Sequence, residues 1–177
     1  MRIERGMVHV YTGDGKGKTT AALGLALRGL GWGLRVMMVQ FIKGYKNIGE
    51  IKFAEEYPGG FAVRQFAVDL KRVIDERKVL ARKREAEEAM RFAEDVVKSG
   101  EFDLVILDEL AVAVHYGLIE LDRVLVLVRE KPGHVELVIT GRNAPEELIQ
   151  AADYATEMRL VRHPYDKDVQ ARPGVDY

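Results

Sequence analysis

Residues 13–20 read Gly13-Asp14-Gly15-Lys16-Gly17-Lys18-Thr19-Thr20, a stretch too rich in glycine for a regular helix or strand. A β-forming apolar run, residues 7–12, precedes it, and residues 18–31 follow it with the composition of a helix. Phosphate is bound by backbone N–H groups that glycines allow to turn inward, by the positive end of a helix, by a lysine, and by a hydroxyl that holds Mg²⁺. All of these are present here, so the stretch predicts a nucleotide-binding P-loop.

The spacing within the stretch departs from the usual phosphate-binding motif by one residue. Three residues, rather than four, separate Gly13 from the Gly17-Lys18 pair, because Thr12 stands where the outer glycine would be. The alternative interpretation is a structural glycine turn that binds no ligand. The strand before the stretch and the helix after it favour phosphate binding.

An acidic pair follows another buried strand. Residues 104–107 are apolar and β-forming, and Asp108 and Glu109 come directly after them. In nucleotide-binding sheets, an acid at the carboxyl end of such a strand lies beside the phosphate loop and holds the metal directly or through water. We therefore expect Asp108 and Glu109 to serve the same Mg²⁺ as Thr19.

Apolar strands alternate with helices along the rest of the chain. The expected strands cover residues 7–12, 35–41, 61–67, 102–107, 135–140 and 158–161, and the expected helices cover residues 18–31, 48–57, 74–99, 110–116, 121–130 and 145–152. This alternation predicts an α/β fold, a P-loop three-layer sandwich with a mostly parallel central sheet. We expect a single domain over residues 1–177, with an irregular tail from about residue 162 to residue 177.

The composition limits the classes of function. The 177 residues are 47% hydrophobic and 31% charged, which is ample for a core, and 27 Lys+Arg against 28 Asp+Glu give a net charge of −1. This balance argues against a nucleic-acid binder. Cysteine is absent, so disulfides, thiolate metal sites and cysteine nucleophiles are excluded. No apolar run approaches the ~18 residues of a membrane span, and we expect a cytoplasmic protein.

Two arginines and four histidines complete the candidate set. Arg142 follows the fifth expected strand at its carboxyl end, and Arg28 lies ten residues after Lys18; each is either a nucleotide contact or a solvated side chain. The histidines show neither metal-ligand spacing nor triad partners, so we interpret them as structural. The sequence offers no Ser-His-Asp or paired-carboxylate arrangement for catalysis.

With these features in view, the sequence resembles the ATP-dependent corrinoid adenosyltransferases, which act on cob(I)alamin and cob(I)yrinic acid a,c-diamide. The resemblance covers most of the chain, and a shortened phosphate loop is itself a trait of this family. The matching blocks are residues 13–22, Val39-Gln40-Phe41-Ile42-Lys43-Gly44, Leu107-Asp108-Glu109-Leu110, Pro132-Gly133-His134, Ile139-Thr140-Gly141-Arg142, and residues 163–166 and 174–177 of the tail.

The resemblance implies a reaction and a set of roles. The cobalt(I) of a reduced corrinoid attacks the 5′-carbon of ATP, a cobalt–carbon bond forms, and inorganic triphosphate leaves; the nucleotide lies reversed in the loop. Cobalt(I) is the nucleophile, so the protein needs none of its own. A reductase that supplies cobalt(I) and a homodimeric assembly are also implied. By position, Lys18, Thr19 and Glu109 are catalytic, Thr19, Asp108 and Glu109 serve Mg²⁺, and residues 13–20, Arg28 and Arg142 contact the nucleotide.

One departure from the family concerns the corrinoid side. Family members often carry a Gly-Phe-Thr-Trp-like stretch after the third strand, whose aromatic rings lie against the lower face of the corrin. Here residues 65–72 read Gln65-Phe66-Ala67-Val68-Asp69-Leu70-Lys71-Arg72. Phe66 and Leu70 are the nearest apolar replacements. Phe41 and Tyr45, after the second strand, are candidates for the other side of the corrinoid site.

Two other functions stay open at this point. A P-loop ATPase or kinase would cleave the γ-phosphate, with Glu109 positioning the attacking group. A non-catalytic module would bind ATP and leave it intact. The product distinguishes the three functions, because it is triphosphate, orthophosphate or none.

Overall fold

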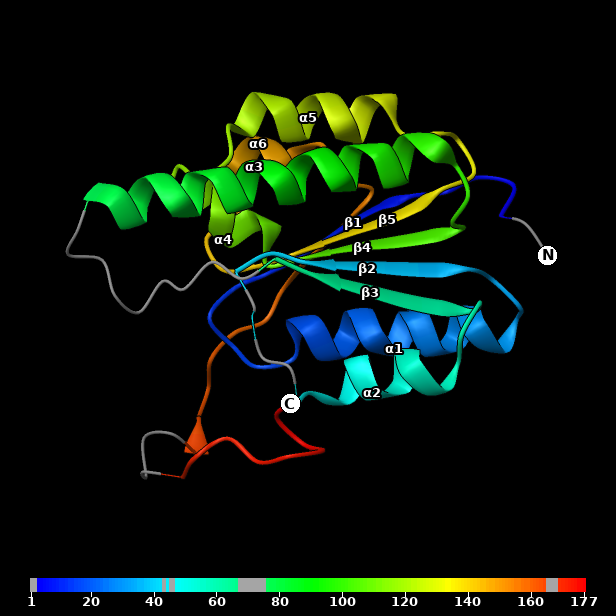
Figure 1. Ribbon diagram of the computed structural model, residues 1–177, viewed down its shortest axis with the longest axis horizontal. Helices are drawn as coiled ribbons and strands as arrows, with labels where there is room; N and C mark the ends of the chain where they lie inside the picture. The colour runs from blue at the N-terminus through cyan, green and yellow to red at the C-terminus, as the bar shows by residue number, and fades with distance from the viewer. Residues whose placement is uncertain (1–2, 43, 45–46, 67–75, 165–168) are drawn as a thin grey trace.

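A central β-sheet with helices on both faces forms the body of the protein (Figure 1). The computed structural model describes residues 3–42, 44, 47–66, 76–164 and 169–177. The strands are β1 (Val8–Thr12), β2 (Val36–Gln40), β3 (Phe61–Gln65), β4 (Leu104–Asp108), β5 (Glu136–Thr140) and β6 (Tyr154–Glu157). The helices are α1 (Lys18–Gly31), α2 (Gly49–Glu56), α3 (Glu76–Ser99), α4 (Leu110–His115), α5 (Leu121–Glu130) and α6 (Glu146–Gln150).

The strands lie in the order β3-β2-β4-β5-β1-β6, and each neighbouring pair is parallel. The predicted α/β sandwich is confirmed, and within the described residues the sheet is parallel throughout. A parallel sheet places the carboxyl ends of all its strands at one edge. The loop after β1 and the acidic pair at the end of β4 therefore open onto the same edge, with only β5 between the two strands.

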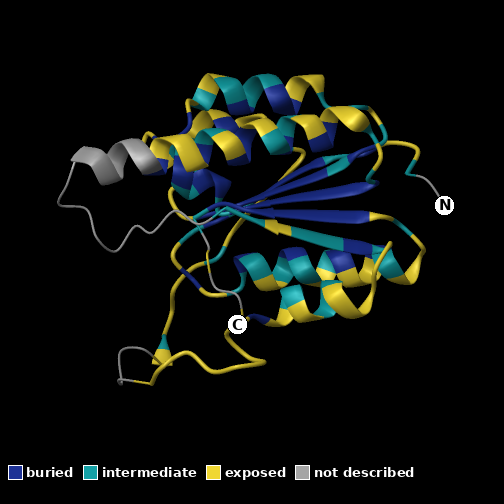
Figure 2. Ribbon diagram, in the orientation of Figure 1, coloured by how far each residue is buried: buried dark blue, intermediate teal, exposed yellow. Residues whose placement is uncertain are grey.

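Two hydrophobic layers attach the helices to the sheet. Helices α1 and α2 cover one face, and α3, α4, α5 and α6 cover the other (Figure 1). Successive residues of a strand point to opposite faces, so on β2 Met38 packs with Ala22 and Ala26 of α1 while Val39 packs on the α3 side. Both faces of the central strands are buried (Figure 2), which explains why their sequences are almost continuously apolar.

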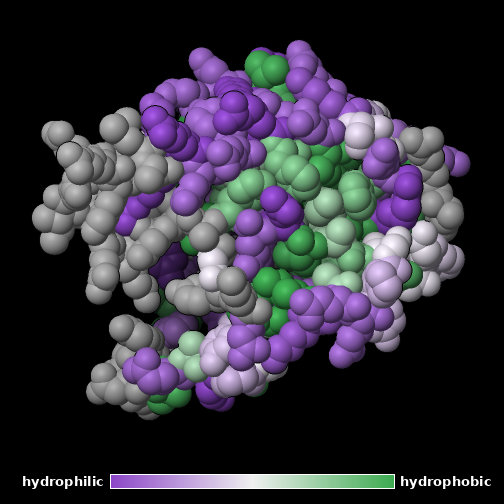
Figure 3. All heavy atoms as spheres, in the orientation of Figure 1, coloured by the Kyte–Doolittle hydropathy of each residue, from purple (hydrophilic) through white to green (hydrophobic). Residues whose placement is uncertain are grey.

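Helix α3 carries a stripe of small buried residues and a charged outer surface. Ala89, Ala93 and Val97 are buried against the sheet, whereas Glu87 and Glu94 form ion pairs with Arg123 of α5 at 2.6 and 2.7 Å. Figure 3 shows hydrophilic residues over these outer helices and hydrophobic residues along the sheet edge between the two helical layers. In the part of the chain that the structure describes, no helix has both the length and the apolar character that a membrane span requires.

The prediction of the last strand, residues 158–161, is wrong. Strand β6 is Tyr154–Glu157, and it pairs with β1 from His9↔Tyr154 to Thr12↔Glu157. All four residues of β6, an edge strand, are exposed, so no apolar pattern marks it. The apolar side chains of Leu160 and Val161, which favoured the wrong segment, are exposed as well. The other described boundaries lie within two residues of the expected ones.

Candidate active site

The glycine loop, residues 13–17, connects β1 with α1 and packs against the backbone that follows β6. Gly13 and Gly17 have φ values of 93° and 122°, which residues with a Cβ atom rarely adopt. A Cβ atom on Gly13 or on Gly15 would lie 2.6 Å from the carbonyl oxygen of Met158. Gly15 also donates its N–H to that oxygen at 2.6 Å. Both the shape of the loop and this close contact therefore require glycine.

Lys18, the first residue of α1, turns its ammonium group back into the glycine loop. Nζ donates to the carbonyl oxygens of Gly13 at 2.6 Å and Gly15 at 2.8 Å. The residue is buried, and burial lowers the pKa of Lys18, while the nearby charge of Glu109 acts in the opposite direction. The loop thus holds a cationic donor at the position where the motif predicts a phosphate contact.

Thr19 and Asp108 are joined by a hydrogen bond across the carboxyl edge of the sheet. Thr19 Oγ1 donates to Asp108 Oδ1 at 2.9 Å, and Thr140 Oγ1, at the end of β5, donates to the same oxygen at 2.7 Å. Asp108 is 0% exposed. The structure therefore brings the P-loop hydroxyl and the strand-end acid together, as the two sequence motifs led us to expect.

Glu109 has a left-handed backbone conformation at the start of α4. Its φ and ψ are 62° and 16°, and its N–H donates to Thr140 Oγ1 at 3.0 Å. For a residue other than glycine, this conformation costs on the order of 1 kcal/mol. Such strain persists where the surroundings impose it and is frequent at functional sites. The side chain of Glu109 lines the same cavity as Lys18 and Thr19.

The loop cavity, as we name this polar space of about 360 Å³, contains most of the predicted nucleotide-side residues. It is surrounded by residues of the glycine loop, of α1, of the strand ends and of the tail. Its lining comprises Asp14, Gly15, Lys16, Gly17, Lys18, Thr19, Thr20, Glu109, Arg142, His163, Pro164, Val169, Gln170, Ala171, Arg172 and Asp176. Arg142 lies at this cavity because Gly141, with φ 144°, lets the chain turn directly after β5.

Arg28 is the predicted nucleotide contact that lies elsewhere. It is exposed on α1 and lines neither of the two cavities described here. At 1.5 Å of rise per residue, ten residues place it about 15 Å along the helix from Lys18. Its charge acts instead on Tyr11, where it opposes the burial that raises the pKa of that phenol. The geometry gives no support to a nucleotide contact by Arg28.

Tail residues line part of the loop cavity, which their composition does not predict. Lys16 Nζ lies 3.2 Å from Asp176 Oδ1 and donates to the carbonyl oxygen of Val175 at 3.1 Å. These contacts join the glycine loop to a segment 159 residues later in the chain. Composition describes the tail only as polar and irregular; the family-like blocks at 163–166 and 174–177 were the feature that could have indicated its place.

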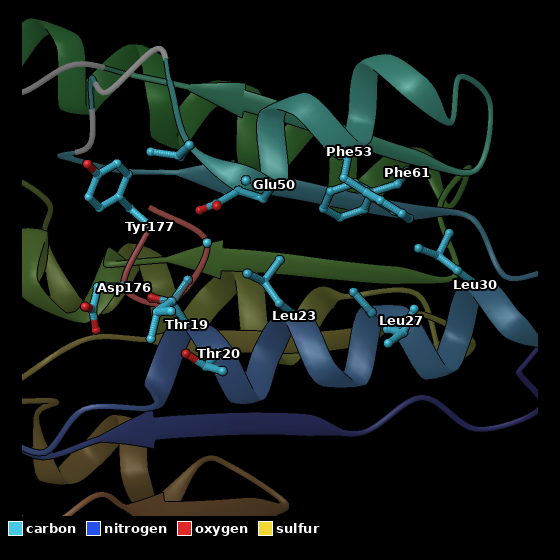
Figure 4. Close-up of a pocket in the computed structure, with 15 residues that line it drawn as sticks. Thr19, Thr20, Leu23, Leu27, Leu30, Glu50, Phe53, Phe61, Asp176 and Tyr177 are labelled. Atoms are coloured by element: carbon cyan, nitrogen blue, oxygen red, sulfur yellow. The ribbon is translucent and has the colours of Figure 1, made fainter. Parts of the chain in front are cut away.

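A second space, the apolar cavity of about 470 Å³, lies between α1 and α2. Figure 4 shows Leu23, Leu27 and Leu30 of α1 facing Phe53 and Phe61, with the last residues of the tail at one end. The cavity shares Thr19, Thr20 and Asp176 with the loop cavity. A polar compartment and an apolar compartment therefore meet at the start of α1.

The predicted corrinoid contacts are only partly supported by their positions. Phe41, directly after β2, is 1% exposed and packs with Val39 in the core on the α3 side, so its position does not support a ligand contact. Phe66 is partly buried, and its ring centroid lies 5.7 Å from that of Phe92. The Arg64 guanidinium lies 5.6 Å from the centroid of the Phe66 ring. Tyr45 and Leu70 lie outside the described residues.

Comparison with known proteins gives one consistent family. Residues 4–177 match the sequence profile of a family described as ATP:corrinoid adenosyltransferase BtuR/CobO/CobP. The corrinoid adenosyltransferase of Pseudomonas aeruginosa is 38% identical over 177 residues, which cover 99% of this chain and 86% of that protein. The corrinoid adenosyltransferase CobA of Salmonella typhimurium is 37% identical over 174 residues, which cover 98% and 87% of the two chains.

Among solved structures, the fold is similar to that of a KaiC-like protein from the archaeon Pyrococcus horikoshii OT3. The TM-score is 0.57, and the match covers 90% of this chain and 75% of that one. The two sequences are 17% identical, so this likeness concerns the fold alone.

Proposed function

This chain belongs to the ATP:corrinoid adenosyltransferase family and is an enzyme that transfers an adenosyl group from ATP to a corrinoid, and from this premise we propose how its residues perform the transfer. The corrinoid enters as substrate with its cobalt in the cobalt(I) state. The cobalt donates an electron pair to C5′ of ATP, and the cobalt–carbon bond forms as the C5′–O bond breaks. Triphosphate leaves with the electron pair of that bond, and the cobalt is formally oxidised to cobalt(III).

The basic side chains at the loop cavity are the observation that supports this proposal most directly. A departing triphosphate gathers negative charge, and groups already fixed around it stabilise the transition state without reorganising. Lys18 lies inside the loop, Lys16 borders the cavity, and Arg142 reaches it from the end of β5. We assign phosphate binding to these side chains and to the loop N–H groups, with Asp14 and Thr20 as further nucleotide contacts.

The donor set beside the loop fits Mg²⁺, which binds hard oxygen ligands and keeps several waters. The hydroxyl of Thr19 and the carboxylates of Asp108 and Glu109 are such ligands. Within the described residues, no group of three or more His, Asp or Glu side chains forms a metal cage, and Mg²⁺ held mainly by phosphates does not need one. We assign direct contact to Thr19 and Glu109, and to Asp108 the task of holding Thr19. When bound, Mg²⁺ neutralises charge on the triphosphate.

On the corrinoid side, we assign contact to Phe66, together with Tyr45 and Leu70. Phe66 follows β3 and lies at the carboxyl edge, where ligands of open α/β sheets bind. An apolar surface against the lower corrin face would exclude water there and favour four-coordinate cobalt, which is the more easily reduced form. Phe41 is no longer a candidate for this contact because of its burial in the core.

We further propose a cytoplasmic homodimer that receives cobalt(I) with the help of an external reductase. The chain contains no cysteine, and its other side chains supply no electrons for cobalt, so the reductant comes from elsewhere. The length of α3 is more than one small sheet needs for cover. Sedimentation that finds only a 20.0 kDa species at micromolar concentration would reject the dimer.

The decisive experiment is incubation of the protein with ATP, Mg²⁺ and a chemically reduced corrinoid. We expect the cobalt(I) absorbance to decay only when protein and ATP are both present, with one triphosphate released for each corrinoid adenosylated. A reaction without protein controls for spontaneous oxidation of cobalt(I). If the protein instead produced ADP and orthophosphate while the cobalt(I) absorbance stayed constant, the ATPase function would replace the transferase function.

A further inference from the structure

A buried amide connects the acid at the end of β4 with helix α2. Gln40 is the last residue of β2 and is 0% exposed. The strand register pairs it with Asp108 of β4 on one side and with Gln65 of β3 on the other. The three polar side chains therefore form a row across the carboxyl edge of the sheet, behind the glycine loop.

Each polar atom of the Gln40 amide has a partner. Nε2 donates to Glu50 Oε1 of α2 at 2.8 Å and, in a longer hydrogen bond of 3.4 Å, to Asp108 Oδ2. Oε1 accepts a hydrogen bond from Gln65 Nε2 at 2.7 Å. Because both carboxylates lie on the nitrogen side, the orientation of the amide is determined by its surroundings. In the described part of the chain, every buried polar side-chain atom has a partner, so loss of this amide would leave several groups unsatisfied.

The Gln40 amide restrains the carboxylate of Asp108. One oxygen of Asp108 accepts hydrogen bonds from Thr19 and Thr140, and the other accepts from Gln40. A carboxylate bound through both oxygens cannot rotate without breaking a bond. Its orientation, in turn, fixes the Thr19 hydroxyl, which donates a hydrogen bond to Asp108 and so presents the lone pairs of its oxygen to the loop cavity.

Gln40 also separates two acidic groups. The Gln40 amide lies between the buried carboxylate of Asp108 and the half-buried carboxylate of Glu50. Without this amide, the two like charges would repel each other with less screening than in bulk water. Glu50 lines the apolar cavity (Figure 4), whereas Asp108 holds the hydroxyl at the loop cavity. The amide therefore links the walls of the two cavities.

We propose that Gln40 is a positioning residue for Mg²⁺·ATP, acting through Asp108 on Thr19 and tying that pair to α2 through Glu50. This inference rests on the proposed function only for the identity of the bound metal and nucleotide. The competing explanation is that Gln40 merely satisfies buried polar groups. The two differ in one respect: a positioning role makes the effect of Gln40 depend on Mg²⁺, and a merely structural role does not.

The test is a calorimetric titration of ATP into the purified protein, with Mg²⁺ and again with EDTA. In Gln40→Met, which keeps the length of the side chain and removes the amide, we expect the Mg²⁺-dependent gain in ATP affinity to fall about 10- to 100-fold, as for other residues that support a metal ligand. Affinity in EDTA should stay at the wild-type value. Gln65→Met is the matched control, because it removes a bond to the same amide but leaves the bond to Asp108; its Mg²⁺-dependent gain should be retained.

The proposal would be overturned if Gln40→Met lost ATP affinity equally with and without Mg²⁺, or lost none in either condition. It would also be overturned if the ATP affinity of the wild-type protein did not depend on Mg²⁺. If Gln40→Met does not fold, Gln40→Asn serves instead, because its amide is too short to reach Asp108 and should give the same selective loss. The product assay keeps the two proposals apart. A wild-type protein that binds Mg²⁺·ATP but releases no triphosphate contradicts the proposed function, while the calorimetric result for Gln40 stands.

Discussion

Asp176, the next-to-last residue of the sequence, places its Oδ1 3.2 Å from the Nζ of Lys16 in the glycine loop. Arg172 holds the other oxygen of the same carboxylate, through its backbone N–H at 3.0 Å and its Nε at 3.1 Å. A segment with neither helix nor strand is thus ordered by charge-assisted hydrogen bonds. Lys16 is a proposed phosphate ligand, so the tail and the nucleotide use the same ammonium group.

The titration of Asp176 gives a prediction for pH. Hydrogen bonds from Arg172, and then from Lys16, lower the pKa of Asp176 to about 2, below the ~3.9 of a free aspartate. A lowered pKa stabilises the docked tail fully above pH ~4, and this contribution is lost as the pH falls toward 2. We expect the carboxyl resonance of Asp176 to show no titration between pH 8 and pH ~4. A midpoint near 4 would mean that Arg172 and Lys16 do not hold the carboxylate in solution.

Replacement of Lys18 tests the phosphate site. Lys18→Ala removes a charge-assisted contact and should cost about 2–4 kcal/mol in transition-state stabilisation, which is a large fall in kcat/KM for ATP. Lys98→Ala is the control, because Lys98 lies at the far end of α3 in an exposed pair with Glu130. Calorimetry and turnover measurements that find the two variants alike would remove the glycine loop from the site.

Thr140 predicts a measurable loss of stability. Its hydroxyl donates to Asp108 and accepts from the N–H of Glu109, so Thr140→Val removes two hydrogen bonds at the carboxyl edge of the sheet. We expect the free energy of unfolding to fall by about 1–3 kcal/mol in chemical denaturation. Thr140→Ser keeps the hydroxyl and should lose less. Equal losses in the two variants would show that the methyl group, rather than the hydrogen bonds, is responsible.

Replacement of Glu109 should raise the stability of the protein and lower its activity. Glu109→Gly relieves the left-handed conformation and should raise the free energy of unfolding by about 1 kcal/mol, while removal of the carboxylate lowers turnover with Mg²⁺·ATP. Glu120→Gly is the matched control, since Glu120 precedes α5 with φ −71° and has no such strain to lose. A Glu109→Gly variant that is both less stable and fully active would contradict the assignment.

Phe66 predicts a dependence on the oxidation state of the starting corrinoid. If its ring helps to keep cobalt four-coordinate, Phe66→Ala should slow adenosylation when the reaction starts from cobalt(II) and a reductant. The effect should be much smaller when cobalt(I) is supplied ready-made, because the ring acts before the transfer step. Stopped-flow absorbance measures both rates, and equal slowing in the two reactions would exclude this role.

Sequence patterns predict the fold well where burial dictates them. Residues 18–31 form a helix with the expected ends because the glycine loop fixes its start. The buried strands follow from their continuous apolar runs. Strand β6 cannot be predicted in this way, because its four residues are exposed. It is held by backbone hydrogen bonds to β1, and these do not depend on the side-chain composition.

In the candidate site, too, sequence patterns indicate some residues and not others. Glycine conformation and the chemistry of phosphate binding indicate the loop, and the end of an apolar strand indicates Asp108. The buried position of Phe41 does not support the predicted corrinoid contact, because an aromatic residue after a strand can point to the core as readily as to a ligand. Gln40 and Asp176 act through partners 68 and 160 residues away, which only the strand register and the folded tail bring together.

The position of the tail has a practical consequence for the preparation of this protein. Residues 174–177 line the apolar cavity and Asp176 contacts Lys16, so a purification tag fused after Tyr177 would begin beside the apolar cavity and the glycine loop. The chain enters β1 from the opposite, amino edge of the parallel sheet. Affinities measured with carboxyl-terminally tagged protein should therefore be repeated after its removal.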